Sequence, residues 1–250
     1  AGDFNADGKT DLAVGAYTFY GGSGDTGRAY LFYNGAIITE AATGADTIIT
    51  GDGTFRRFGY ALVSGDFDAD GDVDLAVGAY DYPGNGPGRV YLFWNDGSYP
   101  SVVSSADVVV SGESDGNNPV YFGTALAAGD FNADGKTDLV VGSYSYSYTN
   151  TTGRSYIFYA DGTNNFGTVA CSGTPAACSA ANADVIITGE SGSAFGITLV
   201  SGDFNADGRT DLAVGGSYYS TNTGRTYVFY NDGSIPTTAA TADLILQGGA

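Results

Sequence analysis

The sequence predicts an all-β protein, and more specifically a β-propeller of four-stranded antiparallel blades. Three observations predict this fold class: one motif occurs four times, each repeat carries strand signals without a helical pattern, and the composition favours sheets and turns. The motif begins at Asp3, Asp66, Asp130 and Asp203, at spacings of 63, 64 and 73 residues. The 250 residues include 40 Gly, 19 Tyr and 14 Phe, which is typical of a turn-rich, aromatic-rich β protein. Repetition at such periods indicates stacked structural units.

The second repeat shows the expected order of elements most clearly. A strand opening on Phe-Gly, at 58–64, runs through an acid-rich loop into the unalternating apolar run 75–78, which indicates a strand covered on both faces. A strand opened by Gly-Arg follows at 89–94, and a turn leads to a last strand at 106–112. The other repeats place apolar runs at 12–15, 139–142 and 212–215, Gly-Arg strands at 28–33, 154–159 and 225–230, and last strands at 45–51, 183–189 and 242–248. Short antiparallel strands with two apolar faces fit blades around an axis.

We interpret residues 1–250 as one β-propeller domain, with repeats at about 1–57, 58–121, 122–194 and 195–250. The first repeat lacks a Phe-Gly strand before its loop, and the last repeat ends after a last-strand signal. An unpaired sheet edge invites pairing with another chain. We therefore expect either a window of a longer repeat array or a neighbouring chain that supplies the missing strand. A closed four-bladed monomer is the alternative.

The repeated motif has the spacing of a cation-binding loop. In the second copy, side-chain oxygens stand at loop positions 1, 3, 5 and 9, and Gly71 stands at position 6, where a chain wrapping around an ion turns with a positive φ. Position 7 is expected to offer its carbonyl while its side chain points away, which explains why Lys or Arg stands there in three copies. The predicted metal-site residues are Asp3, Asn5, Asp7, Lys9, Asp11, Asp66, Asp68, Asp70, Asp72, Asp74, Asp130, Asn132, Asp134, Lys136, Asp138, Asp203, Asn205, Asp207, Arg209 and Asp211.

The donor set favours Ca²⁺ as the bound ion. Hard oxygen donors, with no His in the chain and no Cys near a loop, argue against zinc, copper or iron. Mg²⁺ is a weaker candidate, because it prefers few protein ligands and retained water. The competing interpretation is that Asp, Asn and Gly form metal-free turns. It leaves unexplained why mutually repelling carboxylates are gathered in four loops, so we expect four Ca²⁺ sites.

Charge and cysteine content restrict the environment of the protein. The formal net charge is −19, and 14 of the 28 acidic residues lie in the four loops. This acidity argues against nucleic acids and anionic membranes as partners, because both are recognised through basic faces. No apolar run approaches the roughly 20 residues of a membrane-spanning helix. Cys171 and Cys178 lie in a small-residue stretch that the other repeats lack, and we expect a local disulfide there, with free thiols as the alternative.

The order of the motifs resembles a known repeat. Phe-Gly, then Gly-Asp-Phe-Asn-Ala-Asp-Gly-Lys-Thr-Asp-Leu-Ala-Val-Gly-Ala, then Gly-Arg-x-Tyr-x-Phe is similar to the FG-GAP repeat of integrin α-subunit propellers and of many bacterial surface proteins. The resemblance covers the entire chain. It implies that each loop binds Ca²⁺ between the first and second strands of a blade and that partners usually meet the opposite face. Integrin-type propellers have seven blades, whereas this chain has four repeats.

The residue content argues against catalysis. There is no His for a Ser-His or Cys-His arrangement, both lysines lie in the loops, and only Glu40, Glu113 and Glu190 are glutamates. We predict a non-enzymatic, extracellular or cell-surface module for adhesion or for recognition of a protein or glycan. A structural subunit of an extracellular fibre or surface array, built from copies of the chain, is the alternative. An accessory module of a secreted polysaccharide-active enzyme is a third.

Tyrosine-rich loops at the end of the repeats opposite the acid-rich loops favour recognition, because Tyr suits interfaces. Packing of these rings between blades is the alternative. The arginines that open the Gly-Arg strands are expected to pair with carbonyls or carboxylates at the blade edges. The predicted partner-binding residues are Tyr17, Tyr20, Tyr82, Tyr146, Tyr148 and Tyr219.

Overall fold

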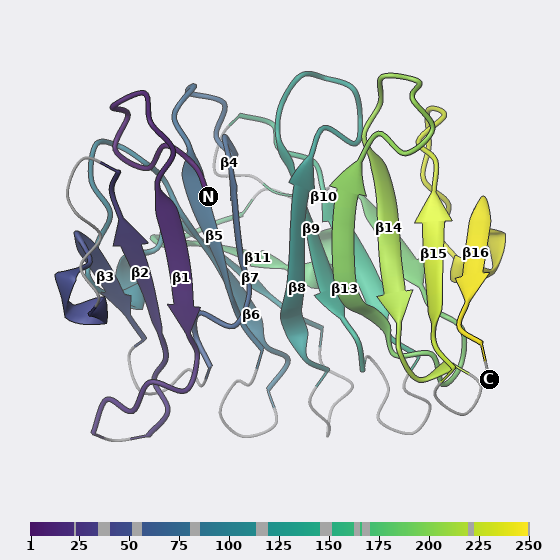
Figure 1. The fold of residues 1–250 in the computed structure, drawn as a ribbon, viewed down its shortest axis with the longest axis horizontal. Coiled ribbons are helices and arrows are strands. Elements are labelled where there is room, and N and C mark those ends of the chain that lie inside the picture. The colour runs from purple at the N-terminus through teal and green to yellow at the C-terminus, as the bar shows by residue number, and fades with distance from the viewer. Residues whose placement is uncertain are drawn as a thin grey trace.

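The chain folds into four β-sheets that stand in a row (Figure 1). The computed structural model describes residues 1–22, 24–34, 41–51, 57–80, 86–113, 120–145, 152–162, 166, 171–219 and 223–249. Sheet 1 contains β1 (Leu12–Ala16), β2 (Arg28–Phe32) and β3 (Thr47–Thr50). Sheet 2 contains β4 (Leu62–Gly65), β5 (Asp74–Ala79), β6 (Arg89–Phe93), β7 (Val108–Ser111) and β11 (Ala176–Ser179). Sheet 3 contains β8 (Phe122–Gly129), β9 (Asp138–Ser143), β10 (Arg154–Phe158) and β12 (Val185–Thr188), and sheet 4 contains β13 (Phe195–Gly202), β14 (Asp211–Gly216), β15 (Arg225–Phe229) and β16 (Leu244–Gln247).

Each repeat builds its sheet with the same antiparallel register. The apolar run pairs with the Gly-Arg strand, so that Leu75 lies opposite Phe93 in sheet 2 and Leu212 opposite Phe229 in sheet 4. The Gly-Arg strand then pairs with the last strand of the repeat. The predicted strand order and the all-β class are therefore confirmed, although the last strands are shorter at both ends than the sequence signals.

Two features differ from the sequence-based expectation. Sheet 2 has a fifth strand, because β11 from the cysteine-containing stretch of the third repeat pairs parallel to β7. The predicted disulfide is present and joins Cys178 of this strand to Cys171. The expected absence of helix is wrong in one respect, because a three-residue 3-10 turn precedes the last strand of every repeat. These turns are η1 (Ala42–Gly44), η2 (Val103–Ser105), η3 (Ala180–Asn182) and η4 (Ala239–Thr241).

The hydrophobic core consists of three clusters, one between each pair of neighbouring sheets. Each cluster contains the Phe of a Phe-Gly pair, and Phe58, Phe122 and Phe195 are all fully buried. Phe58 lies edge-on against Tyr91 of β6, and Phe195 lies edge-on against Tyr227 of β15. The Phe-Gly strand thus connects the sheet of its own repeat to the preceding sheet.

The row has two uncovered ends. β8 packs against β4, β5 and β13, whereas sheets 1 and 4 lie at opposite ends of the molecule (Figure 1). The expectation that apolar runs are covered on both faces holds for β5 and β9, in which every residue is buried. It fails in sheet 1, where Leu12 and Val14 of β1 are 42% and 40% exposed. At the other end of the row, Leu246 of the last strand β16 is 54% exposed. No helix among the described ranges is long and apolar enough to cross a bilayer.

Candidate metal centres

The four acid-rich loops are tight left-handed turns that lead into β1, β5, β9 and β14. At position 6 the φ angles are 83° at Gly8, 100° at Gly71, 85° at Gly135 and 87° at Gly208, which confirms the predicted positive φ. Position 4 is also left-handed although it is an alanine, with φ of 56° at Ala6 and 63° at Ala69. A non-glycine residue in this region costs about 1–2 kcal/mol. Other contacts of the loop must offset that strain.

Backbone amides hold the side-chain oxygens of positions 1, 3 and 5. In the first loop the Asp3 carboxylate accepts hydrogen bonds from the N–H groups of Asp7 (3.1 Å) and Gly8 (2.7 Å). Asn5 Oδ1 accepts from the N–H of Asp7 at 3.1 Å, and Asp7 Oδ1 accepts from the N–H of Lys9 at 2.9 Å. The third and fourth loops have the same four bonds, and the second has three of them. The predicted ligands of each loop are therefore brought together by the loop's own backbone.

Position 9 connects each loop to the sheet. Asp74 is fully buried, and its carboxylate accepts hydrogen bonds from the N–H of Phe67 in the loop (2.8 Å) and from the N–H of Asn95 after β6 (2.9 Å). The equivalent bonds are present at Asp11, Asp138 and Asp211. Ligand spacing did not reveal this second role, although an Asp directly before an apolar run is the signal that could have done so. A carboxylate oxygen has two lone pairs, so these bonds leave it able to bind a cation.

The second loop shows that a hard cation fits the donor set. Carboxylate oxygens of Asp66, Asp68 and Asp74 all lie within 4.8 Å of one another. Asp66 Oδ1 is buried and has no hydrogen-bond partner within the described structure. Burial in particular raises the pKa of Asp68 above its usual range and the pKa of Asp74 to about 7, and in the third loop it raises the pKa of Asp138 to about 7. Buried carboxylates that gather and resist ionisation are groups that a cation would stabilise.

The basic side chains at position 7 do not all point away from the loop as expected. Lys9 Nζ lies 3.6 Å from Asp7 Oδ2, and Lys136 Nζ lies 3.7 Å from Asp134 Oδ2, although each pair is partly exposed. Arg209 instead donates to the carbonyl of Asn231, at 3.3 Å. Each ammonium is thus attracted to the position 5 carboxylate beside it. At position 7 the backbone carbonyl is therefore the group that we expect to bind the cation.

A line of tyrosine rings crosses the molecule at the opposite end of the strands. We call Tyr17, Tyr60, Tyr80, Tyr121 and Tyr144 the tyrosine row. Successive ring centroids in this row are 5.0, 4.4, 5.7 and 4.8 Å apart. The acid-rich loops precede β1, β5 and β9 and the tyrosine loops follow them, so the two features lie at opposite ends of the same strands (Figure 1).

The predicted partner-binding tyrosines divide into three groups. Tyr17 and Tyr20 are 38% and 65% exposed, and Tyr218 beside the predicted Tyr219 is 50% exposed. Tyr219 packs against Arg225, whose guanidinium carbon lies 3.4 Å from the ring centre. Tyr82, Tyr146 and Tyr148 lie outside the described residues. Exposed and packed rings therefore both occur, and Tyr60 and Tyr121 are members of the row that sequence reasoning missed.

Two arginines of the Gly-Arg strands pair with carboxylates, as predicted, and these ion pairs join neighbouring sheets. Arg154 NH1 lies 2.6 Å from Glu113 Oε2, and Tyr156 donates its hydroxyl to the same oxygen at 2.8 Å. Arg225 and Tyr227 bind Glu190 in the same way, at 2.7 and 2.6 Å. Each glutamate follows the last strand of the preceding repeat. Two of the three glutamates are thus occupied in structural ion pairs.

Comparison with known proteins identifies the class of repeat. The model of the FG-GAP repeat matches residues 1–32, 58–93, 122–158 and 195–229. The chain therefore belongs to the FG-GAP repeat family, which confirms the resemblance in the sequence motifs.

Its relatives are much longer proteins. Phosphatidylinositol-glycan-specific phospholipase D of Bos taurus is 32% identical over 176 residues, which cover 66% of this chain and 19% of that protein. Integrin alpha-5 of Xenopus laevis is 32% identical over 160 residues, which cover 60% of this chain and 14% of that protein. Integrin alpha-IIb of Homo sapiens is 36% identical over 154 residues, with 57% and 14% covered. The chain thus spans a fifth or less of the length of these relatives.

Proposed function

We propose that this chain is a non-enzymatic, extracellular recognition module. Its four sheets are blades of a β-propeller, Ca²⁺ in the four loops stabilises one end of the blades, and the opposite end meets a protein or glycan at a cell surface. The single observation that carries the proposal is that the acid-rich loops and the exposed aromatic rings lie at opposite ends of the strands. Acid-rich loops begin β1, β5, β9 and β14, while exposed aromatic rings follow β1 and β14.

The calcium part of the proposal rests on the orphaned oxygen of Asp66 and on the repetition of the loop. The carboxylates and amides of positions 1, 3, 5 and 9 would hold the ion together with the carbonyl of position 7. When bound, Ca²⁺ would supply positive charge to acids that otherwise repel one another. Integrin alpha subunits and a phospholipase D are similar in sequence to the chain. We extend the surface location and the recognition role from the integrin likeness.

The recognition part rests on the tyrosine row. Tyr60 and Tyr17 are 41% and 38% exposed while they contact each other, so the row presents rigid aromatic surface at its exposed end. Tyr rings combine apolar area with a hydroxyl and lose little conformational entropy on binding. A catalytic role lacks comparable support, since Glu113 and Glu190 are held in ion pairs and the Asp clusters are assigned to the metal.

The test is a binding screen of the calcium-loaded chain against a glycan array and a panel of extracellular matrix proteins. For any ligand found, Tyr17→Ala at the exposed end of the row and Tyr20→Ala beside it should weaken binding about tenfold or more without changing the melting temperature, because both rings are exposed. Asp232→Ala is the matched control, since Asp232 is exposed and follows β15 at the end of the strands where the acid-rich loops lie. Ligand binding that survives both tyrosine substitutions would place recognition elsewhere.

A structural subunit is the second candidate function. The observation in its favour is the exposed apolar surface at both ends of the row, at Leu12 and Val14 and at Leu246. Concentration-dependent polymerisation measured by light scattering would support it, and a chain that stays monomeric at high concentration would exclude it.

A further inference from the structure

One buried residue joins the third and fourth acid-rich loops. Asn231 follows β15 and is 2% exposed. Its backbone N–H donates to Oδ1 of Asp211, at position 9 of the fourth loop, at 2.8 Å. Its side-chain amide donates to the carbonyl of Phe131, at position 2 of the third loop, also at 2.8 Å. Asn231 is thus bonded to two predicted ion sites that belong to different repeats.

Two further contacts cross the same junction. The hydroxyl of Ser201 donates to the carbonyl of Ala128 at 2.7 Å, and each of these residues stands two places before position 1 of its loop. Thr210, at position 8 of the fourth loop, packs on Gly129, where an added Cβ would lie 2.6 Å from its Cγ2. The backbone that leads into position 1 of the third loop is therefore in contact with the fourth repeat.

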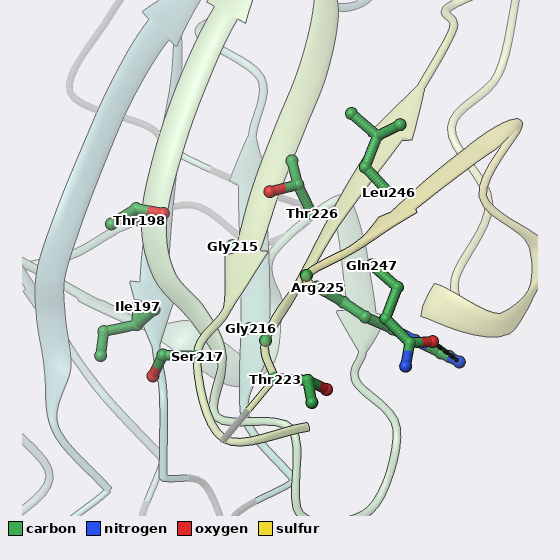
Figure 2. Close-up of a pocket in the computed structure, with 12 residues that line it drawn as sticks. Ile197, Thr198, Gly215, Gly216, Ser217, Thr223, Arg225, Thr226, Leu246 and Gln247 are labelled. Atoms are coloured by element: carbon green, nitrogen blue, oxygen red, sulfur yellow. Dashed lines mark hydrogen bonds between the residues drawn. The ribbon is translucent and has the colours of Figure 1, made fainter. Parts of the chain in front are cut away.

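Asn231 is also carried by a strand that is fixed at its far end. Arg225, the first residue of β15, pairs with Glu190 at 2.7 Å and donates to Gln247 of β16 at 3.0 Å, the contact drawn in Figure 2. At the near end, Arg209 of the fourth loop donates to the carbonyl of Asn231 at 3.3 Å. Rigid elements transmit a displacement instead of absorbing it. A change in the fourth loop is therefore passed on to the third.

The junction between the second and third loops lacks both side-chain hydrogen bonds. Ala160 stands at the position of Asn231, and Ala128 stands at the position of Ser201. The backbone N–H of Ala160 still donates to Asp138, at 3.0 Å, as the backbone of Asn231 does in the fourth repeat. The two junctions therefore share their backbone pattern and differ in their side-chain donors.

The junction between the first and second loops is intermediate. The hydroxyl of Ser64 donates to the carbonyl of Ala1 at 2.8 Å, as Ser201 does in its own repeat. Asn95 stands at the position of Asn231 and is 2% exposed, but its Nδ2 has no hydrogen-bond partner within the described structure. This junction thus has one of the two bonds.

We propose that Asn231 couples the third and fourth loops, so that Ca²⁺ binds to these two loops with positive cooperativity, whereas the second and third loops bind their ions independently. The proposal rests on the calcium part of the proposed function. Asn231 acts as a positioning residue and does not bind an ion itself.

The coupling follows from the order of the contacts. An ion in the fourth loop fixes Asp211 and, through it, Asn231. The amide of Asn231 then holds the carbonyl that lies between the position 1 and position 3 ligands of the third loop. The third loop loses less conformational freedom when it binds its own ion, which favours that binding. Because coupling between two sites is reciprocal, an ion in the third loop favours the fourth by the same factor.

The position 6 glycines give a separate readout for each loop. The N–H groups of Gly71, Gly135 and Gly208 donate to the position 1 carboxylates of their own loops, at 3.1, 2.9 and 2.9 Å. Their amide resonances, followed by nuclear magnetic resonance while the chelator-treated chain is transferred through Ca²⁺-buffered solutions, therefore yield one midpoint per loop.

Loss of the fourth ion should weaken binding in the third loop. Asp207→Ala removes a ligand of the fourth loop and should raise the Ca²⁺ midpoint at Gly135 roughly two- to tenfold, the range expected for one hydrogen bond. The midpoint at Gly71 should stay the same. Asp134→Ala should raise the midpoint at Gly208 by the same factor.

Matched variants assign the effect to Asn231. Asn231→Ala removes the link, and alanine is already accommodated at this position in the third repeat. In that background Asp207→Ala should no longer move the Gly135 midpoint, and this double-mutant cycle separates coupling from effects on either loop alone. Asn231→Ser, whose hydroxyl is too short to reach the carbonyl, serves if the alanine variant does not fold. Asn34→Ala makes the same change where the residue is exposed and should leave the shift intact.

The outcomes separate the coupling from calcium binding itself. A chain that binds four ions, with the same Gly135 midpoint in wild type and in Asp207→Ala, would overturn the coupling and leave the calcium sites standing. A shift that persists without the Asn231 amide, or that Asp70→Ala in the second loop reproduces, would show that the coupling runs through the shared core. Glycine amides that do not respond to Ca²⁺ would contradict the calcium part of the proposed function, and the coupling with it.

Discussion

At the scale of single residues, the acid-rich loops are shaped by backbone amides before any ion is bound. Asp3, Asn5 and Asp7 each accept hydrogen bonds from N–H groups two to five residues further on. These bonds offset part of the repulsion between neighbouring carboxylates, because a charged acceptor strengthens a hydrogen bond. A substitution at one position should therefore affect a single loop and leave the other three intact.

Loss of one predicted ligand should remove one ion. Asp70→Ala and Asp134→Ala should each lower the stoichiometry of Ca²⁺ binding from four to three, because every loop supplies its own ligands. Titration calorimetry of the chelator-treated chain measures the number directly. Asp232→Ala, an exposed acid outside the loops, should leave four sites. A stoichiometry that stays at four in both loop variants would mean that these acids do not bind the ion.

Backbone strain gives a second prediction. Gly71 has φ of 100°, and a Cβ added to it would meet no described atom within 4 Å, so Gly71→Ala should cost about 1–2 kcal/mol through backbone conformation alone. Ala69 has φ of 63°, so Ala69→Gly should be neutral or stabilising. Thermal melting of the two variants tests the pair. Equal destabilisation by both would contradict the left-handed conformation of this loop.

The buried acids predict an unusual pH dependence for the metal-free chain. Burial raises the pKa of Asp74 and of Asp138 from 3.8 to about 7, so the folded state binds more protons than the unfolded state between these values. Stability of the chelated protein should therefore fall as the pH rises from about 4 to about 7. Ca²⁺ needs the ionised form, so its affinity should rise over the same range. Melting temperatures in chelator that increase toward pH 7 would show that these carboxyls ionise without cost.

At the scale of elements, the repeats made most of the fold predictable. Strand order followed from local apolar patterns such as Leu75 to Gly78, and the positive φ of Gly71 followed from its position in the loop. β11 could not be predicted, because Ala176–Ser179 consists of small residues and pairs with β7 of a different repeat. Sequence reasoning also missed part of the tyrosine row, because this row depends on contacts between different repeats. Tyr60 and Tyr121 stand at the start of Phe-Gly strands, and only the packing of neighbouring sheets brings them beside Tyr80.

The exposed fraction of the Phe at loop position 2 depends on whether another sheet packs against the sheet that carries it. Phe131 is 2% exposed, and its carbonyl accepts a hydrogen bond from Asn231 of the next repeat, whereas Phe204 is 45% exposed. Phe131→Ala should therefore cost about 3–5 kcal/mol, and Phe204→Ala should cost much less. Denaturant unfolding of the two variants compares them at the same position of the same motif. Similar losses would mean that the outer face of sheet 4 is covered in solution.

At the scale of the whole molecule, each sheet packs mainly on its neighbours, and stability is distributed along the row. The three clusters between the sheets contain the apolar contacts, while each acid-rich loop ties the start of one strand to the turn after the next strand. Ion binding in one loop would thus stabilise one sheet directly, and its neighbours would benefit through the shared core.

Removal of the ions should therefore destabilise the molecule as a whole. If free Ca²⁺ is at about ten times its dissociation constant, each site contributes roughly 1.4 kcal/mol, and four sites contribute about 5–6 kcal/mol. That rivals the total net stability of a typical domain, about 5–15 kcal/mol. The melting temperature should fall strongly in chelator, recover with added Ca²⁺, and fall by a smaller step in Asp70→Ala. Because only the folded chain assembles the loops, a melting curve that chelation leaves unchanged would refute calcium as the stabilising ion.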